Sequence, residues 1–238
     1  MDELTIDRTA PRRIALDGGS WLDLAEGFVR DPDRALHDLH ATTAWRQQEV
    51  LRYERYVPEQ RLHASLAPSR HPLLHQSDLH LRSTYRVPAQ GAAAILYRNG
   101  DDFQGLHSDR ELRWLDDTLI AIVVLGARRP FVLRPRRPLA TLADKVPAGA
   151  DPSDVVLTPG EGDLLVMGGA CQRDWLHGVP RAPGELRPRV SLTWRWTSRR
   201  GRPDTNPSYY DGRNYSDRPR RPGTRTRQPG TRTRPAGR

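Results

Sequence analysis

Hydrophobic and polar residues alternate without a break between residues 189 and 196. Arg189, Ser191, Thr193 and Arg195 share one face, and the positions between and after them are Val, Leu or Trp. Successive side chains of a strand point to opposite faces of its sheet, so this pattern predicts a strand with one apolar face. The polar face either lies in water or, because it carries two arginines, lines a wet cavity.

Shorter apolar runs predict a mainly β protein. We expect strands at residues 92–98, 119–125, 130–134, 154–157, 163–167 and 189–197. The run 119–125 is apolar throughout, which is typical of a strand covered on both faces.

The region before these strands has a different pattern. Amphipathic periodicity predicts helices near residues 20–26 and 33–40, and a strand near residues 45–53. Farther along the chain, residues 135–150 are expected to form an exposed loop.

Three candidate metal ligands accompany the predicted strands. His107 and Asp109 follow a strong turn signal and, two residues apart on an extended segment, would share a face. His177 follows another apolar run. Alone, a His-x-Asp also occurs by chance in solvated turns, and a single His in surface loops. Together, two imidazoles and a carboxylate can hold iron(II) with positions left open, while Arg189 and Arg195 supply cations for a dicarboxylate.

Several blocks of this sequence resemble the AlkB family of iron(II)- and 2-oxoglutarate-dependent dioxygenases. They occur in the same order over roughly residues 92 to 197, and consistent spacing makes them more specific than any single motif. The blocks lie at residues 97–102, 107–111, 125–131, 162–167, 172, 175–180 and 189–195. The resemblance implies a mostly antiparallel double-stranded β-helix of the jelly-roll type, flanked by N-terminal helices, with the metal inside one end.

The resemblance also implies individual roles. The metal ligands would be His107, Asp109 and His177. The distal carboxylate of 2-oxoglutarate would be bound by Tyr97 and Arg189, with Arg195 near its other end. Glu111 is similar to the acidic position that contacts the substrate base.

Ile95 departs from the family pattern. Members often carry Asn at this position, two residues before Tyr97, where it helps to bind the co-substrate. Ser191 on the facing strand could supply a hydroxyl group instead.

The activity implied by the resemblance is oxidative demethylation of N-alkylated nucleobases in DNA. Iron(II) would be the cofactor, 2-oxoglutarate and O2 the co-substrates, and formaldehyde, succinate and CO2 the products. The substrate would be alkylated DNA with the base flipped out, or single-stranded DNA or RNA. Two alternatives remain: the same chemistry on RNA or another methylated substrate, and a non-catalytic nucleic-acid-binding relative. The intact set of three ligands argues against a non-catalytic role.

Positive charge is concentrated near the C-terminal end. Residues 199–238 contain twelve Arg and three Asp but neither Lys nor Glu, so their net charge of +9 equals that of the whole chain. Their Pro, Gly and repeated Pro-Gly-Thr-Arg-Thr-Arg sequence predict a largely disordered tail. Such a tail either only solubilises the protein or adds sequence-independent contacts to phosphates.

Composition also bears on location and organisation. No apolar run has transmembrane length, no signal-peptide pattern follows Met1, and the single cysteine, Cys171, cannot form an intramolecular disulfide. We therefore expect a cytoplasmic protein with no membrane attachment and no obligate protein partner. The expected parts are a flexible N-terminus (1–19), a helical region that forms a substrate lid (20–90), the dioxygenase core (91–198) and the basic tail (199–238).

The lid region offers several aromatic residues. Candidates for stacking on a base are Trp45, Tyr53, Tyr56 and Tyr85, and packing between helix and sheet is the alternative for each. The remaining histidines show no partner motif and are expected to be ordinary surface or loop residues. They are His37, His40, His63, His71, His75 and His80.

Overall fold

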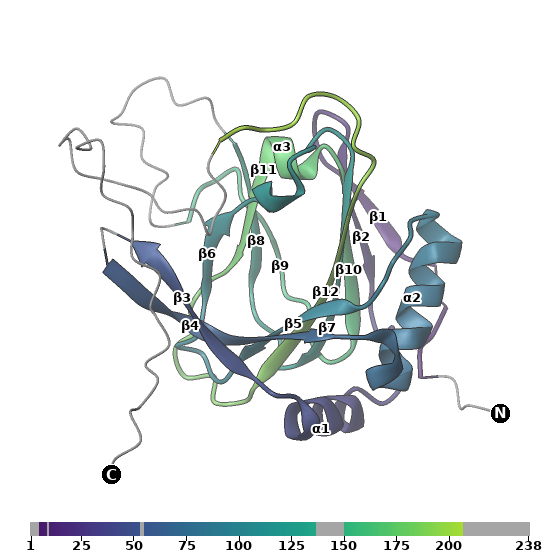
Figure 1. The fold of residues 1–238 in the computed structure, drawn as a ribbon, viewed down its shortest axis with the longest axis vertical. Coiled ribbons are helices and arrows are strands. Elements are labelled where there is room, and N and C mark those ends of the chain that lie inside the picture. Colours follow the sequence, from purple (N-terminus) through teal and green to yellow (C-terminus); the bar gives the residue numbers. More distant parts are fainter. Residues whose placement is uncertain (1–4, 9, 53–54, 137–149, 207–238) are drawn as a thin grey trace, which may run out of the picture.

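Two antiparallel sheets face each other in the computed structural model, which describes residues 5–8, 10–52, 55–136 and 150–206 (Figure 1). The strands are β1 (Arg12–Ala15), β2 (Ser20–Ala25), β3 (Arg46–Arg52), β4 (Arg55–Leu66), β5 (Ala92–Tyr97), β6 (Gln104–His107), β7 (Thr118–Gly126), β8 (Phe131–Pro135), β9 (Val155–Leu157), β10 (Asp163–Gly169), β11 (Trp175–Val179) and β12 (Arg189–Thr197). The helices are α1 (Pro32–Thr42), α2 (Pro72–Tyr85) and α3 (Cys171–Asp174), with short 3-10 turns η1 (Pro68–Arg70) and η2 (Arg110–Leu112).

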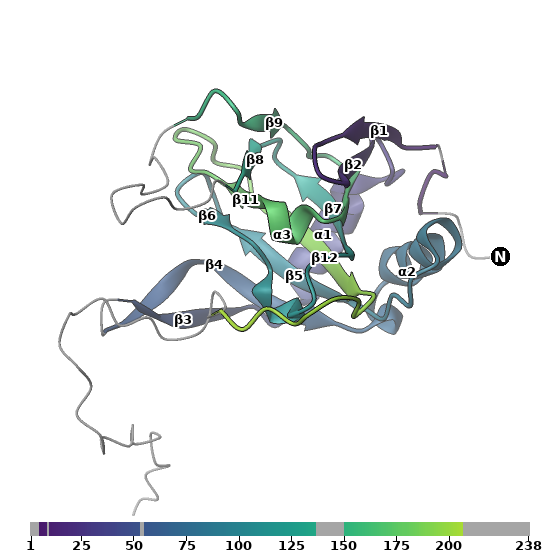
Figure 2. The same ribbon diagram turned by 90° about the horizontal axis from the view of Figure 1, so that it is seen from above.

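The larger sheet has eight strands in the order β1-β2-β10-β7-β12-β5-β4-β3, and the smaller has four in the order β6-β11-β8-β9. Helices α1 and α2 lie outside the larger sheet, on the side away from the smaller one (Figures 1 and 2). The six strands expected from residue 92 onward are confirmed as β5, β7, β8, β9, β10 and β12, with their ends within two residues of the predicted ones.

Strand β7 shows why its sequence is apolar on both faces. Val123 and Leu125 belong to the core between the larger sheet and the helices, whereas Ile120, Ile122 and Val124 belong to the core between the sheets. Each fully buried aliphatic side chain of this kind contributes about 1.5–3 kcal/mol. The strand therefore joins two cores and holds the neighbouring β12 in a fixed position.

The prediction of a helix near residues 20–26 is wrong, because this segment forms strand β2. Leu22 and Leu24 enter the core between the sheets, and Asp23 on the opposite face binds Arg13 at 2.6 Å and Tyr85 at 3.0 Å. A short apolar run suits either a helix or a strand, and pairing with β1 and β10 decides the outcome here.

The other N-terminal expectations meet different outcomes. The helix near residues 33–40 and the strand near 45–53 are confirmed as α1 and β3, whereas β4 and α2 were not predicted. Strand β1 lies within residues 1–19, the segment expected to be flexible. It is ordered as a strand because it pairs with β2 at the edge of the larger sheet. The expected exposed loop and basic tail fall mostly on residues 137–149 and 207–238, outside the described residues. In the part of the chain that is described, no helix has the length and apolar character needed to span a membrane.

Candidate active site

A cavity of about 1400 Å³ is lined by residues of both sheets. Rows of cross-strand neighbours, such as Ala93, Thr193 and Ile122, form one wall, because alternate residues of β5, β12 and β7 face the same side. Of the predicted site residues, seven line this cavity: Tyr97, His107, Asp109, Glu111, His177, Ser191 and Arg195. Arg189 is the exception, since it is 1% exposed and lies next to its cross-strand partner Tyr97.

The structure brings the three candidate metal ligands together. His107 ends β6 and lies opposite His177 on the neighbouring β11, while Asp109 follows His107 at the start of η2. The two imidazole centroids are 4.4 Å apart, and one ligand atom from each of the three residues lies within 4.8 Å of the others. Two nitrogens and one oxygen at this spacing fit an iron(II) ion with positions left open for other ligands.

Local electrostatics keep these groups ready for a metal. Asp109 Oδ2 accepts a hydrogen bond from Arg195 Nε at 2.6 Å, and its Oδ1 lies 3.3 Å from His107 Nε2. Burial alone would raise the pKa of Asp109, but the Arg195 charge and the His107 contact hold it well below its ordinary value. Burial and the nearby His107 lower the pKa of His177 to about 3. A carboxylate and a neutral imidazole are the forms that bind metal.

Neighbouring groups orient the ligands. His107 Nδ1 lies 3.0 Å from the backbone carbonyl two residues earlier, which leaves Nε2 for a metal. The buried Gln172 accepts the backbone N–H of Asp109 at 2.9 Å, and the Phe131 ring stacks on His177 with centroids 5.8 Å apart. The ligand geometry is therefore supported by residues from β8 and α3 as well as by the strands that carry it.

Arg189 has the features of an anion site. Its Nη1 donates to the Pro159 carbonyl at 2.6 Å, whereas its buried Nε and Nη2 have no hydrogen-bond partner within the described residues. Burial lowers the pKa of Arg189 to about 10, and the Tyr97 ring lies on the adjacent strand. A buried guanidinium with unsatisfied donors is costly, and a bound carboxylate would satisfy it. These two donors fit the distal carboxylate of 2-oxoglutarate.

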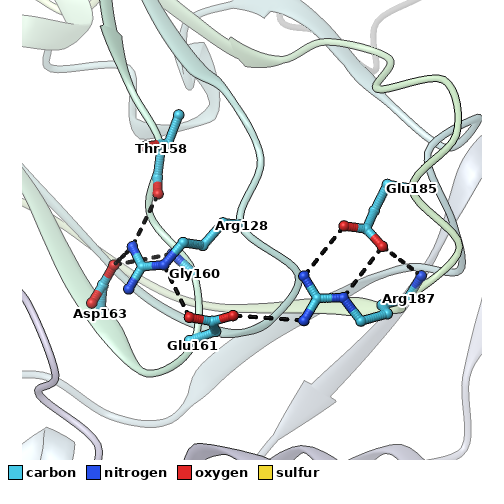
Figure 3. A network of polar contacts seen from close by, with 7 residues as sticks. All are labelled: Arg128, Thr158, Gly160, Glu161, Asp163, Glu185 and Arg187. Carbon is cyan, nitrogen blue, oxygen red and sulfur yellow. Dashed lines mark hydrogen bonds and ion pairs between the residues drawn. The ribbon is translucent and has the colours of Figure 1, made fainter.

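The turn that holds Arg189 is fixed by a network of ion pairs (Figure 3). Arg128 donates to Glu161 at 3.0 Å and to the buried Asp163 at 2.9 Å. Glu161 also lies 3.6 Å from Arg187, two residues before Arg189. The network joins the start of β10 to the segment that enters β12.

Strand β4 adds polar residues that sequence reasoning missed. Glu59, Arg61 and His63 lie on one face, where Glu59 contacts Arg61 at 2.8 Å and His63 at 2.6 Å. Arg61 and His63 line the cavity. The expectation that His63 is an ordinary surface or loop residue is therefore wrong, and so is that for His80, which is buried beside Phe28. The signal in the sequence was that Glu59, Arg61 and His63 occupy every second position, which places them on one face of a strand.

The aromatic candidates of the lid region do not line the cavity in the described structure. Trp45 and Tyr85 pack against the core between helices and sheet, and Tyr85 also stacks on Trp21 at 6.1 Å. Tyr56 is 68% exposed, and Tyr53 lies outside the described residues. Packing, the alternative to base stacking, accounts for Trp45 and Tyr85.

Comparison with known proteins agrees with this fold. The model of the 2OG-Fe(II) oxygenase superfamily matches residues 28–195. The Homo sapiens protein named alpha-ketoglutarate-dependent dioxygenase alkB homolog 3 is 29% identical over 208 residues, which covers 80% of this chain and 71% of that protein. The Homo sapiens DNA oxidative demethylase ALKBH2 is 36% identical over 103 residues, 42% of this chain and 36% of that protein.

A solved structure shows the same fold. The prolyl hydroxylase from Trichoplax adhaerens, in complex with a hypoxia inducible factor oxygen degradation domain peptide fragment, superposes with a TM-score of 0.52 at 11% identity. The match covers 74% of this chain and 83% of that one. The predicted jelly-roll fold is confirmed.

Fold and site thus define a non-haem iron oxygenase. The chain belongs to the 2OG-Fe(II) oxygenase superfamily and, within it, to the AlkB family. It is a dioxygenase that depends on iron(II), 2-oxoglutarate and O2.

Proposed function

We propose that this enzyme oxidatively demethylates N-alkylated nucleobases in DNA. The observation that carries the proposal is the cluster of His107, Asp109 and His177 in a cavity beside Arg189, whose Nε and Nη2 have no hydrogen-bond partner among the described residues. The name of one relative, DNA oxidative demethylase, supports DNA as the substrate. Because DNA and RNA can carry the same N-methylated bases, oligonucleotides of both kinds are compared.

The proposed metal ligands are His107, Asp109 and His177. Iron(II), with 2-oxoglutarate and O2, supplies oxidation of the substrate's N-methyl group, coupled to formation of succinate and CO2. Hydroxylation on that carbon leaves an unstable N-hydroxymethyl group, which releases formaldehyde and the unmodified base. Arg195 holds the Asp109 carboxylate in place through its bond at 2.6 Å.

The proposed 2-oxoglutarate site extends along the wall formed by β5 and β12. Arg189 and Tyr97 bind the distal carboxylate, Ser191 lies in the next cross-strand row, and Arg195 lies at the end nearest Asp109. A fixed cation at each end orients a dicarboxylate so that its oxo-acid end meets the metal.

The size of the cavity favours a nucleobase as second occupant. Ligand pockets usually measure about 300–1,000 Å³, so the larger cavity here has room for a co-substrate and a base. A base inside a duplex cannot reach this depth, so it must be flipped out or belong to a single strand. Glu111, which is exposed and lines the cavity two residues after Asp109, is the proposed contact to the base.

The test is incubation of the purified protein with iron(II), 2-oxoglutarate and oligonucleotides that carry 1-methyladenine or 3-methylcytosine. We expect formaldehyde and repaired base, and loss of both in His177→Ala. A matched control is His75→Ala, which changes an exposed histidine of α2 outside the cavity and should leave turnover unchanged.

Each other outcome has a defined meaning. Faster repair of an RNA oligonucleotide of the same sequence would replace DNA by RNA as the substrate. Formation of succinate without repaired base would support the oxygenase activity but rule out a methylated nucleobase as its substrate. Repair that survives in His177→Ala would reject the proposed ligand set.

A further inference from the structure

Gln104 is a buried amide to which the described residues make no hydrogen bond. It begins β6, three residues before His107, and is 5% exposed. Within the described residues neither its Oε1 nor its Nε2 makes a hydrogen bond, yet the side chain lines the cavity. A buried amide usually finds partners for its donor and acceptor, and a lone unsatisfied one in a cavity indicates a ligand or water that completes it.

The surroundings of Gln104 place it near the proposed distal carboxylate site. The carbonyl of Phe103, the preceding residue, accepts from Arg61 Nη1 at 3.4 Å. Arg129 donates to the carbonyl of Asp102, two residues before Gln104, at 2.7 Å, and its guanidinium carbon lies 5.3 Å from the centroid of the Tyr97 ring. Gln104 therefore lies at the same end of the cavity as Tyr97.

The wall of the cavity that belongs to the larger sheet carries an apolar side chain, Ile95. This residue lies in the cross-strand row of Ser191 and next to the row of Tyr97 and Arg189. Its side chain has no hydrogen-bonding group, so this part of the wall offers a co-substrate no polar contact. Gln104 presents an amide to the same cavity from the smaller sheet.

We propose that Gln104 donates Nε2–H to the distal carboxylate of 2-oxoglutarate. The inference rests on the proposed 2-oxoglutarate site but not on the nucleic-acid substrate. The co-substrate is then held from both sheets, by Arg189 on β12 and by Gln104 on β6.

The experiment measures 2-oxoglutarate binding directly. The full chain is loaded with Mn(II), which supports no turnover, and is titrated with 2-oxoglutarate by calorimetry without any nucleic acid. Because a hydrogen bond to a charged group is lost, Gln104→Leu should weaken binding about tenfold or more. Gln60→Leu, which changes an exposed glutamine of β4 outside the cavity, is the matched control and should bind as the original protein does.

A rescue variant separates recognition from structure. Ile95→Asn combined with Gln104→Leu places an amide on the opposite wall of the cavity and should recover much of the lost affinity. Without ligand, Gln104→Leu should melt at the same or a higher temperature, because an unsatisfied buried amide has been removed.

Two results would overturn the inference. The first is unchanged 2-oxoglutarate affinity in Gln104→Leu, which would also be the result if Gln104 contacts only the base. The second is a lowered melting temperature without ligand and no rescue by Ile95→Asn, which would make Gln104 a structural residue. Neither result depends on whether the enzyme repairs DNA.

Discussion

The hydrogen bond from the Asp109 backbone to Gln172 tests how the metal ligands are held. Gln172 lies in α3, is 1% exposed, and its Oε1 accepts the Asp109 N–H at 2.9 Å. Its Nε2 makes no hydrogen bond within the described residues, so replacement removes this one bond. Gln172→Met keeps a side chain of similar length, removes the acceptor and leaves the buried N–H of Asp109 unsatisfied.

The expected magnitude follows from that unsatisfied donor. It should cost about 1–3 kcal/mol in the free energy of unfolding. For a domain of this size, each kcal/mol corresponds to a melting temperature lower by roughly 2–4 °C. Because Asp109 would also be less well oriented, metal affinity should fall by about tenfold to a hundredfold.

The assay combines thermal melting of the metal-free protein with anaerobic titration by Mn(II). Gln60→Met serves as the control, since Gln60 is exposed and lies outside the cavity. A destabilised Gln172→Met variant with unchanged Mn(II) affinity would refute the orienting role of Gln172. Unchanged stability together with unchanged affinity would refute the hydrogen bond itself.

Three further predictions concern other parts of the structure. Burial raises the pKa of Cys171 to about 11. Iodoacetamide at pH 8 should therefore modify the folded protein far more slowly than the protein in denaturant. Equal rates of modification would contradict the burial of this thiol. Arg128→Met should raise the KM for 2-oxoglutarate by loosening the turn that holds Arg189. Because the change also removes a hydrogen-bond donor from the buried Asp163 carboxylate, it should lower the free energy of unfolding by about 1–3 kcal/mol. An unchanged KM would show that the turn is held without these ion pairs. The hydrogen bonds from Arg134 lower the pKa of Asp154. They therefore stabilise the protein fully above the ordinary carboxyl pKa, and this stabilisation is lost as the pH falls through the lowered pKa of Asp154. Arg134→Met should shift acid unfolding, followed by circular dichroism, to higher pH.

Strand β12 shows how far local sequence carries the prediction. Its alternation over residues 189–196 is a property of consecutive residues, so the strand, its two faces and its polar wall follow from the sequence. The same holds for the apolar β7, whereas β6, which carries His107, is not among the strands predicted from the sequence. Recognition of the three ligands as a set required the order of several blocks, because each His or Asp alone is common.

Contacts between distant segments decided the structure of two regions for which the local sequence pattern allowed more than one outcome. The segment Ser20–Ala25 is a strand because β1 and β10 pair with it, although its short apolar run also suits a helix. His63 faces the cavity because β4 pairs with β5, and no local motif signals that pairing.

The finer arrangement of the site has the same origin. Arg195 binds Asp109 across 86 positions of the chain, and Gln104 lines the same cavity as Ile95. The sequence by itself determined most strands of the dioxygenase core, the candidate ligands and the resemblance to the family. Only the folded structure decided which side chains share the cavity, because periodicity is encoded by neighbours in sequence whereas strand pairing depends on contacts between distant segments.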